Sequence, residues 1–211
     1  MSIHISAWVI RIAVLLFAIT IHEYAHGKVA LLLGDPTAKN AGRLTLNPIS
    51  HIDPIGAICL FLFHFGWAKP VPVDVRYFKS IRRDTVLMAL SGPISNIAAA
   101  FVTGLFLRFY FLPSPFYLTF LIYMLLMNIG LGLFNLLPIP PLDGSHVLEN
   151  ILPPPASWKF RQMRRHAPFI LIGILIMDYY LHLNILSRIL TYPIYKIAYL
   201  FGGDNFYRLI G

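Results

Sequence analysis

The sequence predicts an all-α polytopic membrane protein. We expect a core of three spanning helices, a re-entrant or β-like element at the membrane surface, and one or two C-terminal helices. The 211 residues are 57% hydrophobic and only 12% charged, and the mean hydropathy is +0.69. Soluble domains carry roughly twice that share of charged residues. Residues 109–142 include no charged side chain, and this stretch exceeds the roughly 20 residues that cross a bilayer.

The first predicted span runs from about Ala7 to Leu33 and ends at the helix-breaking sequence Gly34-Asp35-Pro36. A polar segment follows it. Residues Ile55 to Phe65 are apolar again, but eleven residues are too few to cross a bilayer. We therefore expect a re-entrant or interfacial element there rather than a span.

The next segment, residues 66–83, carries five basic side chains. Apolar residues alternate from Val71 to Tyr77, which predicts a strand, although two prolines limit it to the edge of a sheet. The second and third spans are predicted at about Thr85–Leu107 and Phe116–Pro138. Because the turn between them is short and proline-rich, we expect the two helices to be antiparallel neighbours.

The basic residues indicate how the chain is oriented. They lie in loops between apolar segments, mainly before residue 85 and at 159–165, and the positive-inside rule places both groups in the cytoplasm. The first helix then starts outside, and the chain is a multi-pass protein of the cell membrane. Beyond Pro168 the sequence leaves open one span, two spans, or a span plus an interfacial helix.

Charge and cysteine content exclude two other classes. The net charge of +8 does not indicate nucleic-acid binding, because the basic residues form neither one basic helix nor an aromatic-basic array. The single cysteine, Cys59, excludes an internal disulfide and a cysteine-based metal cluster. We expect one integral-membrane domain over residues 1–211, with a core at about 7–150 and a C-terminal helical segment at about 155–211.

The most informative spacing is His22-Glu23-Tyr24-Ala25-His26, inside the first predicted span. Residues four apart share one face of a helix, so His22 and His26 can present two imidazole nitrogens to one tetrahedral Zn²⁺. Glu23 then lies beside the metal, where its carboxylate can take a proton from a water whose pKa zinc lowers to about 7. This is the pattern of the H-E-x-x-H zinc hydrolases. Ionisable residues inside a membrane span also indicate function, because they are costly there.

A catalytic zinc normally has three protein ligands, so a third must come from elsewhere in the chain. The third predicted span ends in a run of prolines, after which Asp143 is the first charged residue in more than thirty positions. Non-helical backbone at membrane depth is tolerated where it lines a water-filled cavity, which a hydrolase needs. His146, three residues further on, is an alternative ligand, although a surface or supporting role suits it better.

With these two motifs the chain resembles the site-2 protease family of intramembrane zinc metalloproteases, in its compact prokaryotic form without an extra peptide-binding domain. The family pattern is H-E-x-x-H on one helix and N-x-x-P-x-x-x-L-D-G on a later one. The second part is matched here by Asn135, Pro138, Leu142, Asp143 and Gly144. Two segments between the motifs also look like that family: Gly66 to Val73 and Ser91 to Asn96.

The resemblance implies that His22, His26 and Asp143 bind one zinc ion per chain and that Glu23 activates water. It also implies that Asn135 hydrogen-bonds the substrate or the developing oxyanion. The substrate implied is a transmembrane protein, cut in or near its membrane segment toward the cytoplasmic side. The partners are thus the lipid bilayer and a protein substrate, with no nucleic acid, and the oligomeric state stays open.

Two rival functions remain open. A non-enzymatic membrane protein could bind or transport a divalent metal through His22, His26 and Asp143. Glu23 separates the two cases, because a transporter would tolerate Glu23→Gln whereas a protease would lose turnover. Another class of membrane zinc protease would use Glu149 as the third ligand, but the Leu-Asp-Gly context favours Asp143.

Several other polar residues have a structural explanation. His51 and His64 flank the expected re-entrant element, and loop hydrogen bonds account for both. Asp178 and His182 are four residues apart, and a helix break at the membrane face accounts for this pair. Asn96 lies where small residues let helices approach closely, so packing explains it at least as well as substrate contact.

Overall fold

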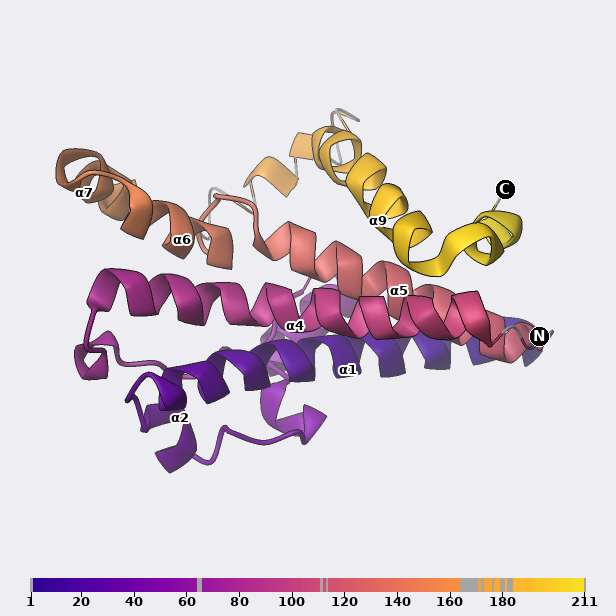
Figure 1. Cartoon of the computed structure of the whole chain (residues 1–211), viewed down its shortest axis with the longest axis horizontal. Helices are drawn as coiled ribbons and strands as arrows, with labels where there is room; N and C mark the ends of the chain where they lie inside the picture. Colours follow the sequence, from indigo (N-terminus) through magenta and orange to yellow (C-terminus); the bar gives the residue numbers. More distant parts are fainter. Residues whose placement is uncertain are drawn as a thin grey trace.

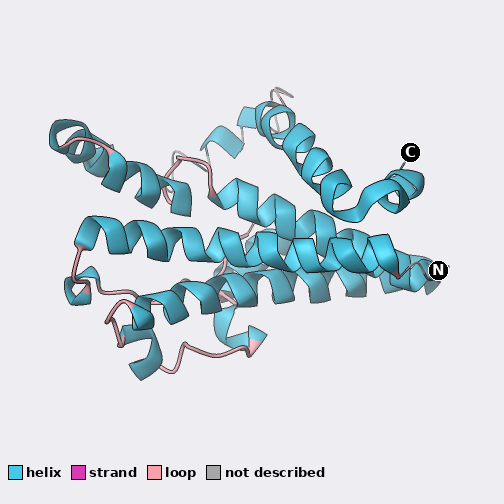
Figure 2. Cartoon of the chain, viewed as in Figure 1, coloured by secondary structure: helices cyan, strands magenta, loops and turns pink. Residues whose placement is uncertain are grey.

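The computed structural model describes residues 2–210 except 64–65, 111, 113, 164–170, 172, 176, 179–180 and 182–183. Three of the described helices are long and apolar enough to cross a membrane: α1 (Ser2–Leu32), α4 (Ile81–Phe109) and α5 (Pro115–Asn135). They coincide with the three predicted spans to within a few residues at each end. Figure 2 shows helices and loops over the described chain, so the predicted all-α fold is confirmed, and its three long apolar helices are compatible with a membrane protein.

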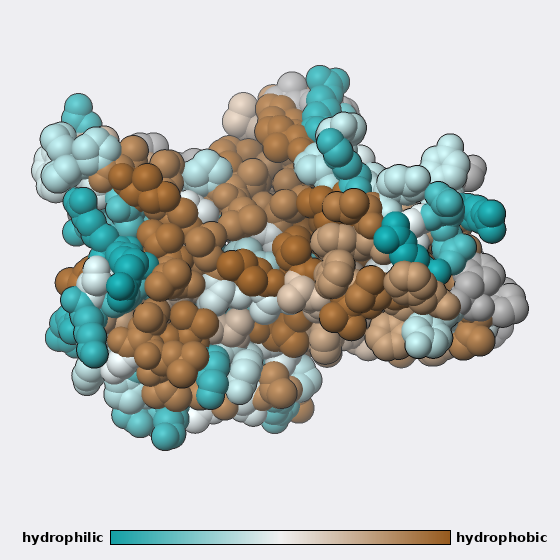
Figure 3. Space-filling view, in the orientation of Figure 1, coloured by the Kyte–Doolittle hydropathy of each residue, from teal (hydrophilic) through white to brown (hydrophobic). Residues whose placement is uncertain are grey.

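The three long helices lie side by side (Figure 1). An apolar core is buried between α4, α5 and the C-terminal helix α9 (Ile185–Ile210). Leu107 of α4 and both Leu125 and Ile129 of α5 are fully buried within it. Their outward faces are apolar as well; Phe101 and Phe106 of α4 are about half exposed. In Figure 3 hydrophobic residues cover the middle of the visible face, and hydrophilic residues gather toward its left and right ends. Helices that are hydrophobic all round suit a lipid environment.

Short elements connect α1 to α4: α2 (Thr37–Asn40), η1 (Pro48–His51), α3 (Pro54–Phe63) and η2 (Val75–Tyr77). The chain enters and leaves α3 at one place, because Ile52 pairs with Ala68 in an isolated antiparallel bridge. A Cβ atom on Gly56 would lie 2.2 Å from the carbonyl oxygen of Trp67, so only glycine permits this approach. The segment therefore returns to its starting point, whereas its insertion into the membrane stays a prediction.

The strand predicted from Val71 to Tyr77 is wrong. The last three of these residues form η2, and no strand is present in the described part of the chain. Side-chain carboxylates take the backbone N–H groups that a neighbouring strand would need. The N–H of Val71 donates to Glu23 at 2.9 Å, and that of Asp74 donates to Asp35 at 2.7 Å. The apolar alternation therefore reflects a loop bound to α1 and to the turn after it.

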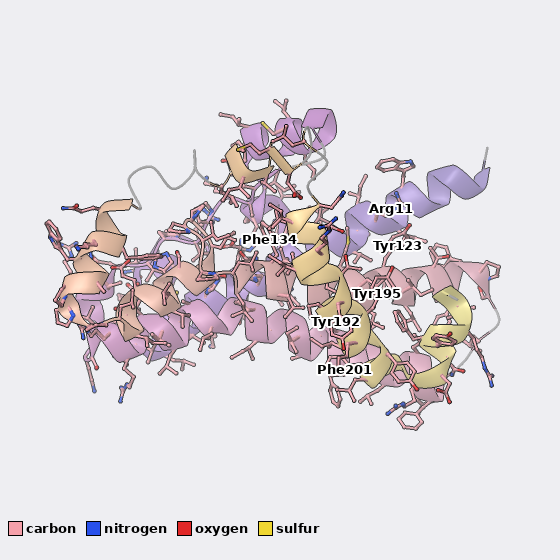
Figure 4. The ribbon with its side chains drawn as sticks, turned by 90° about the horizontal axis from the view of Figure 1, so that it is seen from above. Arg11, Tyr123, Phe134, Tyr192, Tyr195 and Phe201 are labelled. Atoms are coloured by element: carbon pink, nitrogen blue, oxygen red, sulfur yellow. The ribbon has the colours of Figure 1, made fainter. Side chains whose placement is uncertain are left out.

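Three further helices follow the spans: α6 (Asp143–Ile151), α7 (Pro154–Met163) and α9 (Ile185–Ile210). α6 packs on α4, and α9 crosses α4 and α5. Figure 4 shows Tyr192, Tyr195 and Phe201 along α9. α9 includes Pro193 and is kinked at Gly203, where φ is 65°. Most of residues 164–183, where the number of further spans was left open, lie outside the described residues.

Candidate functional site

The histidines of the H-E-x-x-H sequence lie one turn apart on α1 and point to the same place. Both are buried, at 5% and 7% relative exposure for His22 and His26. Their ring centroids are 4.7 Å apart, and their Nε2 atoms approach to 3.1 Å. The shared helix face predicted from the sequence is thus present, with the same nitrogen of each ring turned inward.

Asp143 reaches these nitrogens from the first turn of α6. Its Oδ2 atom lies 3.0 Å from Nε2 of His22 and 3.3 Å from Nε2 of His26. The neighbouring Gly144 makes this position possible, since a Cβ atom there would lie 2.1 Å from the carbonyl oxygen of Leu136 at the end of α5. The close approach of α6 to α5 brings the carboxylate to α1 across 117 residues of sequence.

These three atoms fit a tetrahedral zinc site. Zinc bonds of about 2.0–2.1 Å put neighbouring ligand atoms about 3.3 Å apart in a tetrahedron, and the three separations here are 3.0, 3.1 and 3.3 Å. In the described part of the chain, His22, His26 and Asp143 form the group of metal-ligating side chains whose ligand atoms all lie within 4.8 Å of one another. Two imidazoles and one carboxylate are also a ligand set found in catalytic zinc sites.

Gly92 of α4 leaves the space next to this group. A Cβ atom on Gly92 would lie 2.4 Å from Nε2 of His26 and 2.6 Å from Nε2 of His22. Any other residue would therefore push the two nitrogens away. The absence of a side chain here is a feature that sequence reasoning missed, although the Ser91 to Asn96 segment had been singled out by its resemblance to the family.

The outer nitrogens of both rings have hydrogen-bond acceptors. Nδ1 of His26 lies 2.8 Å from the carbonyl oxygen of Met88, and Nδ1 of His22 lies 2.7 Å from Oδ1 of Asn96. Since these oxygens only accept, each Nδ1 carries a hydrogen and Nε2 is the ring nitrogen that faces Asp143. Two ring nitrogens and a carboxylate oxygen this close together share either a proton or a metal ion.

Asp143 has the charge that such a site needs. Burial acts to raise the pKa of its carboxyl group, but the contacts with His22 and His26 outweigh burial and hold the pKa well below its usual range. The side chain is therefore a carboxylate at neutral pH, which is the form that binds a metal.

Glu23 lies beside the two histidines on α1 and is half-buried. Its Oε2 atom accepts a hydrogen bond of 2.9 Å from the backbone N–H of Val71. That loop is held in turn by Asp35, which is fully buried and accepts from the N–H groups of Thr37 and Asp74. The carboxylate next to the metal group thus has a fixed position, set by a loop 48 residues further along the chain.

The other candidates lie apart from this group. Asn135, the last residue of α5, donates its side-chain amide to the carbonyl oxygen of Leu131 in its own helix at 3.1 Å. Glu149 is buried and forms an ion pair of 2.9 Å with Arg161 of α7. Neither Glu149 nor His146 belongs to the metal-holding group among the described residues.

The remaining histidines and Asp178 are accounted for in part. His51 is fully buried, and its Nε2 atom lies 2.9 Å from the carbonyl oxygen of Thr45, so the loop hydrogen bond expected for it is confirmed. Asp178 accepts a hydrogen bond from the backbone N–H of Ile185 at the start of α9. His64 and His182 lie outside the described residues.

The sequence model of Peptidase family M50 matches residues 113–177. The protein named "Putative zinc metalloprotease YwhC" from Bacillus subtilis is 43% identical over 157 residues, which cover 70% of this chain and 71% of that relative. The chain belongs to peptidase family M50.

More distant relatives agree. "Putative zinc metalloprotease Rip2" from Mycobacterium tuberculosis strain H37Rv is 32% identical over 180 residues, covering 81% of this chain and 66% of the relative. Its namesake from Mycolicibacterium smegmatis is 26% identical over 178 residues, covering 82% and 69%. No solved structure matches the chain. The predicted resemblance to the site-2 proteases and the predicted enzyme class are thereby confirmed.

Proposed function

We propose that this M50 peptidase is an intramembrane zinc metalloprotease in which His22, His26 and Asp143 hold one zinc ion. The observation that carries the proposal is the convergence of three ligand atoms, 3.0–3.3 Å apart, beside a glycine that leaves them room. When bound, zinc lowers the pKa of a coordinated water to about 7 and polarises the carbonyl group that is attacked.

Glu23 is the general base and then the general acid. It is the neighbour of a ligand on the same helix, and the Val71 N–H holds its carboxylate in place. From there it takes a proton from the attacking water and returns it to the nitrogen of the leaving amine. Asn135 stabilises the oxyanion or orients the substrate once its amide leaves the Leu131 carbonyl.

The substrate class follows from the depth of the site. His26 and His22 lie six and ten residues before the end of the α1 span at Leu32, about 9–15 Å at 1.5 Å per residue. A peptide bond that reaches them must come from a segment at membrane depth. A stable helix shields its own carbonyl groups, so the substrate is a transmembrane protein that unwinds locally before it is cut.

Orientation and location follow from the charges. Basic side chains lie just before and at the start of α4, and again in α7. By the positive-inside rule, these two basic segments face the cytoplasm. His22 and His26 lie in the C-terminal half of α1, which ends on the same side of the membrane as these basic segments. The chain is thus a multi-pass protein of the cell membrane with its active site toward the cytoplasm.

The test is cleavage of single-span membrane proteins that carry a tag at each end, produced together with the protease. Wild type should yield shortened products, and Glu23→Gln should reduce them by about 10²–10⁴-fold while the zinc content stays the same. Glu149→Gln is the matched control, because it makes the same change at the only other glutamate in the chain. It should keep both zinc and cleavage, whereas loss of zinc from a Glu149→Gln protein that still folds would point to Glu149 as a ligand. Equal cleavage by Glu23→Gln would refute the role of Glu23.

A further inference from the structure

The Ser91 to Asn96 stretch of α4 lies against the metal-holding group but contributes no ligand to it. Gly92 leaves space for the Nε2 atoms, as described above. Asn96 is fully buried, one turn further along α4, and its side chain touches the opposite edge of the His22 ring. A buried polar side chain at this place has a specific set of partners, and these fix what it does.

The orientation of the Asn96 amide follows from its contacts. Its Nδ2 atom donates to the carbonyl oxygen of Ala18 at 3.0 Å and to Oδ1 of Asn128 at 2.9 Å. Both partners are acceptors, so the NH₂ group must face them and Oδ1 must face His22. The distance from this oxygen to Nδ1 of His22 is 2.7 Å.

Asn128 of α5, a hydrogen-bond partner of Asn96, also fixes the orientation of the Asn96 amide. It is also fully buried, and its Nδ2 atom donates to the carbonyl oxygen of Met124 at 2.8 Å. Because a backbone carbonyl only accepts, Oδ1 of Asn128 has to turn toward Asn96. The hydrogen bonds therefore run one way, with His22 donating to Asn96, Asn96 to Asn128, and Asn128 to α5.

We propose that Asn96 and Asn128 are positioning residues of the metal centre: together they hold the hydrogen of His22 on Nδ1 and aim its Nε2 lone pair at the metal. Ligating histidines generally need a partner on the second nitrogen to fix tautomer and ring orientation. The inference rests on the proposed function, since it takes His22 to be a zinc ligand.

The two histidines differ in how their orientation is secured. For His26 the acceptor is the backbone carbonyl of Met88, with the hydroxyl of Ser91 3.4 Å away. No substitution removes a backbone carbonyl. For His22 the acceptor is a side chain, so Asn96 is the replaceable group on which the geometry of the ligand depends. The chain through Asn128 also makes α5 part of the metal centre, although α5 supplies no ligand.

Zinc affinity of the purified protein in detergent, measured by competition with a chelator of known affinity, tests this role. Asn96→Leu removes the acceptor at nearly constant size and should weaken zinc binding about 10–100-fold. Asn128→Leu should weaken it less, because the acceptor on Asn96 remains and its NH₂ group still has the carbonyl oxygen of Ala18 as a partner. Thr103→Val is the matched control. Thr103 is buried two turns further along α4, and its hydroxyl bonds only the carbonyl of Ala99 in its own helix.

Asn96→Asp separates positioning from packing. It keeps an acceptor oxygen toward His22 but turns a second oxygen toward the carbonyl groups of Ala18 and Asn128. A positioning role predicts that zinc affinity is retained better in Asn96→Asp than in Asn96→Leu. A packing role predicts the reverse, because a buried carboxylate facing two acceptors is the more disruptive change.

The possible failures can be told apart. Suppose that wild type binds one zinc, and that Asn96→Leu and Asn128→Leu both bind it as tightly as Thr103→Val does. The positioning role is then overturned, while the proposed function stands. Weaker binding in Asn96→Asp than in Asn96→Leu would overturn it as well. If wild type binds no zinc after reconstitution, the proposed function itself fails. Should Asn96→Leu not fold, the comparison of Asn128→Leu and Asn96→Asp with the control still decides.

Discussion

Gly92→Ala is the smallest change that should disable the metal centre. Gly92 lies on α4, and because it has no side chain it is neither a metal ligand nor a side-chain hydrogen-bond partner of the site. The added Cβ atom would lie 2.4 Å from Nε2 of His26 and 2.6 Å from Nε2 of His22. In a helix remote from a site, the same substitution is normally neutral or stabilising, because alanine has less conformational freedom than glycine in the unfolded chain.

The magnitude follows from these distances. An ordinary contact of a Cβ atom begins at 3.4 Å, so His26 must withdraw by about 1 Å. Zinc sites tolerate deviations of only about 0.2 Å in their ligand distances. A shift several times larger should cost at least as much as losing a group that orients a ligand, about 10–100-fold in zinc affinity. That corresponds to about 1.4–2.8 kcal/mol of binding free energy.

Zinc per chain, measured by atomic emission after dialysis against a zinc buffer, is the assay. Gly130→Ala on α5 is the matched control, because its Cβ atom would meet only the Cδ1 atom of Ile194, at 3.7 Å. Gly130→Ala should bind zinc like wild type and unfold at the same or a slightly higher temperature. A Gly92→Ala protein that binds zinc as tightly as wild type would refute the assignment of the Nε2 atoms as ligands.

Two further substitutions probe the elements that bring the site together. Gly144→Ala would place a Cβ atom 2.1 Å from the backbone oxygen of Leu136, so it should displace Asp143 and reduce both zinc content and thermal stability; unchanged zinc content would show that α6 can shift without moving its ligand. Asp35→Ala should lower the free energy of unfolding by about 1–3 kcal/mol, because it leaves the partly buried N–H groups of Thr37 and Asp74 unpaired. It should also slow cleavage more than it weakens zinc binding, since Asp35 holds the loop that positions Glu23; equal effects on both would argue against that route.

Much of the metal group could be predicted because local rules apply to it. The positions of His22 and His26 follow from the helical repeat within an apolar segment long enough to stay helical. Asp143 followed from a proline-rich break and from the resemblance to a family, and the structure brings it within 3.3 Å of both histidines. The three spans were predictable for the same reason, since a lipid environment leaves little choice of secondary structure.

Contacts between distant segments could not be predicted in the same way. The contact of Asn96 with His22 joins residues 74 apart, and its meaning depends on the direction of an amide that Asn128 fixes. The alternation that predicted a strand at Val71 was a local pattern as well, and it failed because carboxylates from α1 and the turn after it bind the loop backbone. Which partner captures a backbone N–H is decided by the assembled fold.

The central claim is that His22, His26 and Asp143 hold one catalytic zinc. Its most direct test is the zinc stoichiometry of the protein purified in detergent, for wild type, Asp143→Ala and His146→Ala side by side. We predict about one zinc per chain in wild type and in His146→Ala, and almost none in Asp143→Ala. Zinc that survives Asp143→Ala but is lost in His146→Ala would contradict the ligand set, and no zinc in wild type after reconstitution would contradict the account as a whole.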